Sequence, residues 1–226
     1  MNSEVGDAIR AAAIEVVARE AVAVSEVSGQ IDETFVDVAV LLMGCPGKVI
    51  MCGVGTSGFV ARRAAHLFSV SGTPSFYLHP TEGLHGSMGV LQVGDVVVAL
   101  SKGGSSSEVN DLATRVKREN VPVVALTSGP DTTLARIADI AVTIRPDDVA
   151  DPGGVIAMGS TLAYGAWLDA LAVVLMRAKG YGWDRVLFTH PGGAVGHIED
   201  LPERLAPLAL PVRGQAVQHW SDRERR

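Results

Sequence analysis

The chain has few aromatic residues and little charge. Phe, Trp and Tyr make up 5% of its 226 residues, and Asp, Glu, Lys and Arg make up 19%, while hydrophobic residues reach 47%. Alanine, valine and leucine must therefore fill most of the hydrophobic core. A chain of this length suits one domain with a sizeable core.

Cysteine is equally scarce, with only Cys45 and Cys52 present. Two cysteines are too few for a disulfide scaffold, and their spacing fits neither a zinc site nor a thioredoxin motif. Cys52 ends an apolar run that we expect to be a buried strand, so we interpret both thiols as inert and buried. The histidines do not pair at i,i+3 or i,i+4 on a predicted helix, so we favour no metal and expect no cofactor.

An excess of basic residues is also missing. The formal net charge is −6 and the pI is about 5.5, which argues against nucleic-acid binding. An anionic ligand remains possible, because a site responds to local dipoles and hydroxyl groups more than to total charge. No basic N-terminal region leads into an apolar stretch, and no window reaches the roughly 18 uninterrupted apolar residues of a membrane span. We therefore expect a soluble, cytoplasmic protein that does not bind membranes.

Short apolar runs alternate with segments of helical period. The apolar runs predict five strands, at 48–53, 74–79, 95–101, 121–128 and 139–145. The period predicts helices at 5–27, where it includes an apolar stripe, and at 31–43, 57–71, 106–119, 131–138 and 156–179. Short, β-branched strands that alternate with helices are typical of a parallel sheet buried on both faces.

The predicted fold is thus an α/β three-layer sandwich around a five-stranded parallel sheet. We expect one domain over residues 1–200. Residues 201–226 end in the charged stretch "QAVQHWSDRERR" and are expected to form an extension or a tail.

Two loops rich in glycine and serine follow predicted strands and open predicted helices. They are "GVGTSG" (53–58) and "SKGGSSSE" (101–108). In an open parallel sheet, ligands bind beyond the carboxyl ends of the strands. Glycines let backbone amides approach a ligand, helix N-termini carry unpaired N–H groups, and hydroxyl groups add donors. We predict a phosphate site with the candidate ligands Gly55, Thr56, Ser57, Ser101, Ser105 and Ser106.

Other interpretations of these loops stay open. Gly53, Gly55 and Gly58 have the spacing of a dinucleotide-binding motif, but the next predicted strand ends in His79 and supplies no ribose-binding acid. An N-capped helix behind a tight turn explains either loop alone. It does not readily explain three consecutive serines at 105–107.

Two histidine-bearing segments accompany the loops. "HPTEGLHGSMG" (79–89) carries His79 and His85 together with Glu82, and "FTHPGGAVGH" (188–197) carries His190 and His197. Both segments are rich in glycine and proline, so we do not expect packing roles for these histidines. Histidine titrates near neutral pH, and beside an anion site it indicates acid–base chemistry.

These segments together resemble the sugar isomerase (SIS) domain family. The resemblance covers residues 30–198 and rests on "GVGTSG", "GTPSFYLHPTEGLHG", "GDVVVALSKGGSSSEV", "VPVVALTSGPDTTLARIADI" and "FTHPGG". Within the family the chain is most similar to arabinose-5-phosphate isomerases, which interconvert D-arabinose 5-phosphate and D-ribulose 5-phosphate. The "LHP-x-E-x-x-HG" and "HPGG" blocks are the specific parts of this match.

The resemblance implies a flavodoxin-like sheet with a phosphosugar bound over the strand ends. It also implies a homotetramer with active sites built between subunits. It assigns catalysis to His85, Glu108 and His190, and phosphate binding to Ser57, Ser101 and Ser106. Family members often continue into a regulatory CBS pair after "HPGG"; about 30 residues follow here, so we expect none.

The chain departs from the family pattern at several positions. The usual G-x-G-K-S-G has Thr56 in place of its lysine, and the usual S-N-S-G-E has Lys102 and Gly103. Ser87 stands where the family has the aspartate of "HGDLG", and Val149 stands where it has a glutamate. Lys102 is our candidate to supply the cation that is lost at position 56.

The predicted reaction is aldose–ketose isomerisation through an enediol, which moves a proton between C2 and C1. Glu108 is the predicted base, and its alternative role is to complement the dipole of the helix that it opens. His190 and His85 are predicted to assist ring opening and hydroxyl proton transfer. Two alternatives remain: a phosphosugar sensor without turnover, and an isomerase for another pentose or hexose phosphate.

Overall fold

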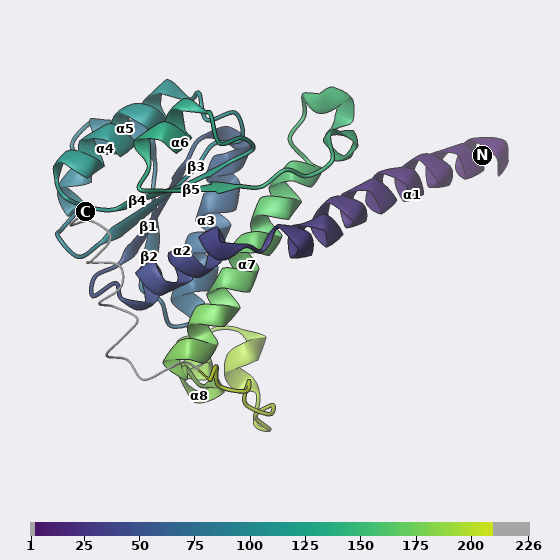
Figure 1. Cartoon of the computed structure of the whole chain (residues 1–226). Helices are drawn as coiled ribbons and strands as arrows, with labels where there is room; N and C mark the ends of the chain where they lie inside the picture. Colours follow the sequence, from purple (N-terminus) through teal and green to yellow (C-terminus); the bar gives the residue numbers. More distant parts are fainter. Residues whose placement is uncertain (1–2, 210–226) are drawn as a thin grey trace.

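A five-stranded parallel sheet forms the centre of the molecule (Figure 1). The structure is a computed structural model, and it describes residues 3–209. The strand order is β2-β1-β3-β4-β5 and every pairing is parallel. The strands are β1 (Val49–Gly53), β2 (Ser75–Leu78), β3 (Val96–Leu100), β4 (Val123–Thr127) and β5 (Ile140–Thr143). This order is flavodoxin-like, so the predicted fold class is confirmed.

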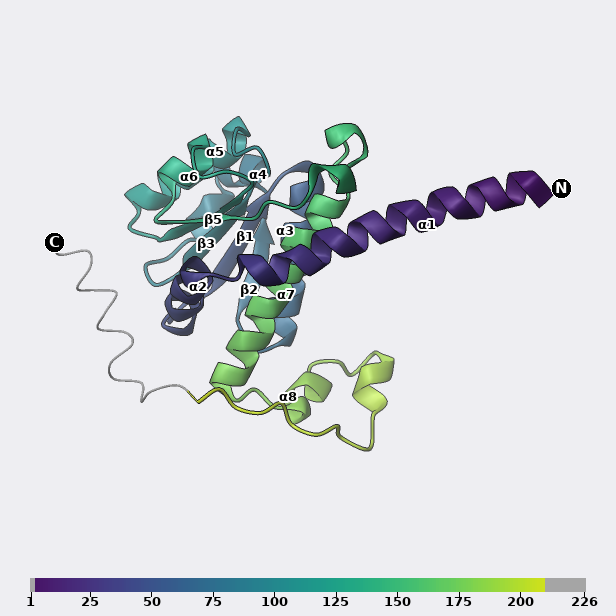
Figure 2. The ribbon, with the colours of Figure 1, turned by 45° about the vertical axis from the view of Figure 1, so that its right-hand side comes forward.

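Helices cover both faces of the sheet and give three layers (Figures 1 and 2). One face packs against α2 (Glu33–Met43), α3 (Gly55–Val70) and α7 (Gly159–Lys179). The other face carries α4 (Pro80–Leu84), α5 (Ser107–Arg118) and α6 (Thr133–Ile137). In β1, Val49 and Met51 face α2, α3 and α7, while Ile50 and Cys52 face α5. Because both faces are covered, every position of the central strands β1, β3 and β4 is buried, and all but Thr127 are apolar or glycine.

The long helix α7 is the centre of one layer. Its Trp167 and Tyr164 are fully buried, and the Trp167 ring meets Phe35 of α2 edge-on, with 5.1 Å between ring centroids. By length and composition α7 would be long and apolar enough to cross a membrane. In this molecule 61% of its most apolar 18-residue window is buried, as expected for the central helix of a core.

Several element boundaries differ from the predictions. The segment predicted as a helix over 156–179 becomes helical only at Gly159, because Gly153 and Gly154 take positive φ values of +66° and +67° in the preceding loop. Two short helices, α4 and α8 (Trp183–Phe188), occupy segments where no helix was predicted. They have 5 and 6 residues, too few to display a helical period.

Helix α1 (Ser3–Glu26) is present as predicted, but its apolar stripe is not buried. Only Ala23 of this helix is buried, and Ile9, Ile14 and Val17 are each more than 60% exposed. Figures 1 and 2 show α1 extending away from the body, with only its last turns against α7. The stripe therefore faces outward in a single chain.

The chain after α8 folds back over the end of α7. Arg177 Nε donates a hydrogen bond to the Ala206 carbonyl at 2.7 Å, and Trp183 Nε1 donates to the Glu203 carbonyl at 2.9 Å. The charged stretch 215–226 lies outside the described residues.

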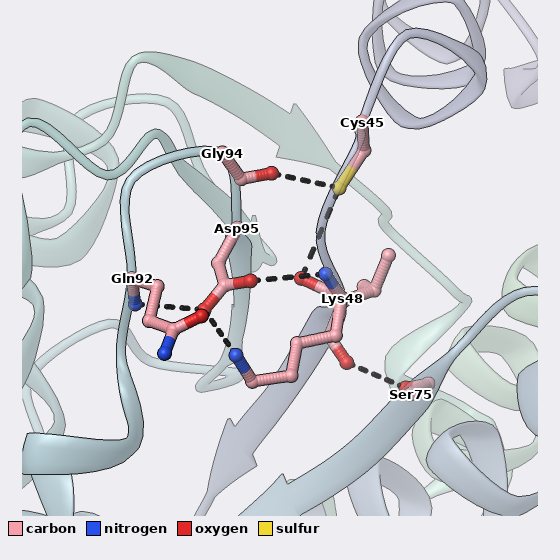
Figure 3. Close-up of polar contacts among 7 residues, drawn as sticks. Cys45, Lys48, Ser75, Gln92, Gly94 and Asp95 are labelled. Carbon is pink, nitrogen blue, oxygen red and sulfur yellow. Dashed lines mark hydrogen bonds and ion pairs between the residues drawn. The ribbon is translucent and has the colours of Figure 1, made fainter.

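A buried carboxylate fastens the amino-terminal edge of the sheet (Figure 3). Asp95 is 2% exposed, and its two oxygens accept hydrogen bonds from Lys48 Nζ at 2.7 Å, Lys48 N at 3.0 Å and Gln92 N at 2.9 Å. Burial alone would raise the pKa of this carboxyl, but these hydrogen bonds outweigh it and hold the pKa below its ordinary value. Asp95 thus ties the start of β1 to the start of β3.

We predict that Asp95→Asn lowers the free energy of unfolding by about 2–4 kcal/mol at pH 7, because it removes charge-assisted hydrogen bonds from a buried site. The folded-state pKa is depressed, so the wild type has this contribution above the unfolded-state pKa of about 4 and loses it as the pH falls through the lower folded-state pKa. Urea unfolding at pH 7 and pH 3 measures both effects, and the gap between the two proteins should narrow at pH 3.

Asp169→Asn is the control for this prediction. Asp169 forms a bidentate ion pair with Arg63 but is 40% exposed, so its loss should cost less than about 1 kcal/mol. Equal effects of the two substitutions would contradict the assignment of Asp95 as the fastening group.

Candidate active site

Two loops border one crevice at the carboxyl edge of the sheet. Gly53 at the end of β1 pairs with Leu100 at the end of β3, so the loops that follow these strands begin side by side. The first loop leads into α3 on one face, and the second leads into α5 on the other. Such a point, where the connections diverge, is where open α/β sheets hold ligands.

Both helices that open at this crevice begin without a side-chain cap. Val54 is the N-cap of α3, and Ser106 is the N-cap of α5, but its hydroxyl makes no capping hydrogen bond. The first N–H groups of each helix therefore have no side-chain acceptor. Gly55 has φ +53°, is exposed, and has open space where a side chain would stand. Unpaired N–H groups at a positive helix end are suited to an anion.

The serines of the second loop gather beside these N–H groups. Ser101 is 5% exposed, and its Oγ lies 3.2 Å from the Oγ of the half-buried Ser106. Ser105 is exposed at the tip of the loop. Ser57 lies in the first turn of α3 and is half-buried, and none of its hydrogen bonds in the described part of the chain reaches the second loop.

A glycine holds the second loop in shape. Gly104 has φ +60°, and a Cβ at this position would overlap the Thr132 side chain. Its carbonyl accepts hydrogen bonds from Leu134 N at 3.0 Å and Asn110 Nδ2 at 3.2 Å, and its N–H donates to the Ser101 carbonyl at 3.0 Å. These contacts fix the loop to α5 and α6.

The predicted cation, Lys102, is held by a buried carboxylate. Its Nζ lies 2.6 Å from Asp151 Oδ2, and Asp151 is 2% exposed. The other carboxylate oxygen accepts hydrogen bonds from Met158 N at 2.8 Å and Ser160 N at 3.0 Å. Burial alone would raise the pKa of Asp151, but these partners lower it to about 2, so the carboxylate is charged at neutral pH.

The sequence did not predict a role for Asp151, since this residue stands 49 residues from Lys102 in a loop without periodic pattern. It also missed Arg62 in α3. The Arg62 guanidinium lies over the Tyr77 ring, 4.4 Å from its centroid, and these two residues line a hollow with Gly55 and His79. The only signal available was a basic residue two turns into the helix after the first loop.

Glu108 lies in the first turn of α5, half-buried and on the face of the sheet away from α7. It is near Cys52 at the end of β1: burial, together with the Glu108 charge, raises the pKa of the Cys52 thiol to about 12. This thiol is therefore protonated and buried, as predicted. Cys45 is half-buried, and burial raises the pKa of its thiol too.

His85 lies on the same face as Glu108. It is exposed at the C-terminal end of α4, which packs against α5. His79, by contrast, has a local structural role that we did not predict: its Nδ1 accepts a hydrogen bond from Thr81 N at 3.3 Å and caps α4.

His190 lies far from these residues within one chain. The 21 residues of α7 run about 30 Å from the Asp151 side of the molecule to the opposite edge of the sheet, where Lys179 Nζ donates to Thr73 Oγ1 before β2. Helix α8 lies at that far end (Figures 1 and 2). His190 follows α8 in the sequence, with its Nδ1 2.6 Å from the Val186 carbonyl, and the exposed His197 comes seven residues later.

Comparison with known sequences points to one family. The SIS domain pattern matches residues 42–174. Arabinose 5-phosphate isomerase KdsD of Shigella flexneri is 38% identical over 182 residues, which are 80% of this chain and 56% of the relative. KdsD of Pseudomonas aeruginosa is 36% identical over 174 residues, which are 77% and 53% of the two chains. The chain thus spans about half the length of the curated relatives it matches.

Comparison with solved structures also shows similarity to sugar-phosphate proteins. An Escherichia coli CFT073 protein in complex with arabinose 5-phosphate superposes with a TM-score of 0.78 at 30% identity, over 84% of this chain and 100% of that one. A Listeria monocytogenes protein, named as a candidate sugar-phosphate isomerase, gives 0.79 at 31% identity over 85% and 100%.

We predict that Gly104→Ala weakens binding of inorganic phosphate by more than tenfold and lowers stability by about 2–4 kcal/mol, because the new methyl displaces Thr132 and the loop. Gly180→Ala is the matched control: Gly180 has φ +62° at the end of α7, with open space around it. That variant should lose about 1 kcal/mol and keep its phosphate affinity. Calorimetric titration and urea unfolding check both, and equal phosphate affinities would count against the loop as the binding element.

Proposed function

The chain belongs to the SIS domain family, and from this membership we propose that it is a phosphosugar isomerase that interconverts an aldose and a ketose. D-Arabinose 5-phosphate and D-ribulose 5-phosphate are the proposed pair, with a related pentose or hexose phosphate as the alternative. The observation that carries the proposal is the crevice between β1 and β3, where two uncapped helix N-termini and the Ser101–Ser106 pair converge. The similarity to the KdsD isomerases supports the same reaction class.

The phosphoryl group is proposed to bind at the N-termini of α3 and α5. The amide of Gly55 and the first N–H groups of α5 supply donors without competition from a side-chain cap. The proposed side-chain ligands are Thr56, Ser57, Ser101, Lys102, Ser105 and Ser106. The sugar carbons then extend toward α4 and α5, on the side of Glu108 and His85.

Glu108 is proposed to move the proton between C2 and C1. A carboxylate suits this step, since it takes the proton from one carbon and returns it to the next on the same face of the enediol. Its half-buried position near the end of β1 limits water access, and the first turn of α5 that carries it follows the second loop directly. The exposed His85 is proposed to transfer hydroxyl protons during ring opening.

His190 is proposed to act in the site of a second copy of the chain. Within one chain it is separated from Glu108 by the length of α7. The exposed apolar residues of α1 support self-association, since isolated molecules seldom leave so many large apolar side chains of one helix in water. A hollow lined by Val24, Phe59 and Leu162 continues this apolar surface to Thr56 of the first loop. We propose a homo-oligomer, with a tetramer as the expected size.

The remaining proposals concern the setting of the site. We propose one phosphosugar-binding domain over residues 1–200, an extension over 201–226, and a cytoplasmic location. A phosphosugar sensor is the second candidate function. It is favoured by Thr56 and Val149, both exposed where a lysine and a glutamate would add charged groups.

We predict that the wild type exchanges the C2 proton of one pentose or hexose phosphate into D₂O, and that Glu108→Gln lowers this rate by about 10²–10⁴-fold while it still binds the sugar. Asp111→Asn is the control, since Asp111 is an exposed carboxylate on the same helix. NMR of a panel of sugar phosphates follows the exchange. Binding without any exchange would support the sensor instead, and full activity in Glu108→Gln would remove Glu108 from the mechanism.

We also predict that mixing two inactive variants, Glu108→Gln and His190→Ala, restores part of the activity, because a site built from two copies can then contain both intact residues. His197→Ala serves as the control and should retain activity by itself. The exchange rate of the mixture, measured after the subunits have been allowed to redistribute, is the readout. Activity that stays at the level of the separate variants would mean that both residues act within one chain.

A further inference from the structure

Two Lys–Asp ion pairs with nearly the same distance and burial lie at opposite edges of the sheet. At the amino edge, Lys48 Nζ contacts Asp95 at 2.7 Å, and their side chains are 26% and 2% exposed. At the carboxyl edge, Lys102 Nζ contacts Asp151 at 2.6 Å, and their side chains are 28% and 2% exposed. The first pair joins strand starts in the core. The second involves a lysine of the proposed phosphate loop, so it can serve a purpose beyond stability.

The backbone of Lys102 is fixed, while its ammonium remains accessible. The Lys102 carbonyl accepts hydrogen bonds from Ser128 N at 2.9 Å and Ser128 Oγ at 2.8 Å. Lys102 also continues the even-numbered positions of β3, which face α7. Its side chain therefore reaches Asp151, whose carboxylate accepts the amides at the start of that helix. A lysine side chain has several rotamers and three donors, so a short movement can bring the ammonium to another anion near the same loop.

Asp151 has other donors close by. Tyr164 Oη is buried and has no hydrogen-bond partner among the described residues, and the buried Ser160 Oγ lies close enough to the carboxylate to help lower the pKa of Asp151. Both lie near the carboxylate: Asp151 accepts the Ser160 amide, and burial together with the Asp151 charge raises the pKa of the Tyr164 hydroxyl. A buried hydroxyl group without a partner, such as that of Tyr164, is costly and uncommon. Both hydroxyl groups offer the carboxylate replacement hydrogen bonds if the ammonium moves away.

We propose that Asp151 determines the affinity of the site for a phosphoryl group. Its buried carboxylate pairs with the Lys102 ammonium, and a phosphoryl group must compete with this carboxylate for the same ammonium. The inference rests on the phosphate site proposed above. When phosphate binds, the ammonium moves toward the phosphoryl oxygens, and Ser160 Oγ and Tyr164 Oη donate to the carboxylate in its place. Asp151 is a positioning residue, since it acts through Lys102 and does not touch the ligand.

The sign of the effect follows from the charges. In the unliganded protein Lys102 and Asp151 neutralise each other, so a phosphoryl dianion meets little net positive charge and one fixed carboxylate. Removal of that carboxylate charge leaves the Lys102 ammonium free to contact the phosphoryl group. It also removes the repulsion between the Asp151 carboxylate and the phosphoryl group, which acts over several ångströms. At the effective dielectric of a half-exposed site, this is worth about a tenfold change in affinity.

The test is a double-mutant cycle on phosphate binding. Asp151→Asn keeps an oxygen that accepts the Met158 and Ser160 amides, but it removes the charge. Titration calorimetry with inorganic phosphate and with D-ribulose 5-phosphate should show about tenfold tighter binding in Asp151→Asn and about tenfold weaker binding in Lys102→Met. In the Lys102→Met background, Asp151→Asn should raise the affinity by clearly less than it does in the wild type, because only the direct repulsion between the carboxylate and the phosphoryl group is then removed.

The ion pair at the amino edge supplies the matched controls. Asp95→Asn removes a carboxylate of the same burial, and Lys48→Met a lysine of the same exposure, far from the crevice. Both should leave phosphate affinity unchanged at a temperature where circular dichroism shows each variant folded. In the isomerase assay, Asp151→Asn should lower KM for the sugar phosphate about tenfold, a shift that a purely structural role would not produce.

The outcomes separate this inference from the proposed function. If the wild type binds phosphate but Asp151→Asn binds it equally or more weakly, the inference is wrong and the isomerase proposal stands. If Asp151→Asn binds a sugar phosphate more tightly but no variant exchanges its C2 proton, the inference stands and the isomerase proposal fails. If neither the wild type nor any variant binds phosphate or sugar phosphate, both are overturned.

Discussion

The parallel pairing of β1 with β3 is the constraint on which the rest of the site depends. It brings Gly53 and Leu100 together at the carboxyl edge, so two loops 48 residues apart in sequence begin as neighbours. Because one loop turns toward α3 and the other toward α5, two positive helix ends meet there without side-chain caps. The acidic net charge of the chain is no obstacle, since these local dipoles decide what the crevice attracts.

Each edge of the sheet also contains one buried carboxylate, and the two have different surroundings. Asp95 accepts hydrogen bonds from Lys48 and Gln92 at the start of two core strands (Figure 3). These donors are far from the proposed phosphate site, so no ligand draws them away from the carboxylate. Asp151 has the same kind of lysine partner, but it borders a loop shaped for an anion, and the buried hydroxyl groups of Ser160 and Tyr164 lie nearby. Similar chemistry thus supports stability at one edge and is suited to ligand binding at the other.

The strands and both phosphate loops could be predicted from sequence, because burial on two faces demands apolar runs and the loops combine glycine with serine. Other features gave no local signal. The pairing of Lys102 with Asp151 is a long-range contact, the cap made by His79 depends on the five-residue helix α4, and Arg62 looks like any basic residue of an exposed helix face. Periodicity predicted helix α1 but could not predict which surface covers its apolar residues. Motif similarity grouped His190 with Glu108 and His85, which lie at the other end of α7 within one chain.

The most direct measurement is a crystal structure of the protein with a bound pentose phosphate. The account predicts that phosphoryl oxygens accept hydrogen bonds from the first N–H groups of both α3 and α5 and from Ser101 or Ser106, with the sugar carbons directed toward Glu108. A phosphoryl group bound elsewhere, or held by only one of the two helices, would contradict it.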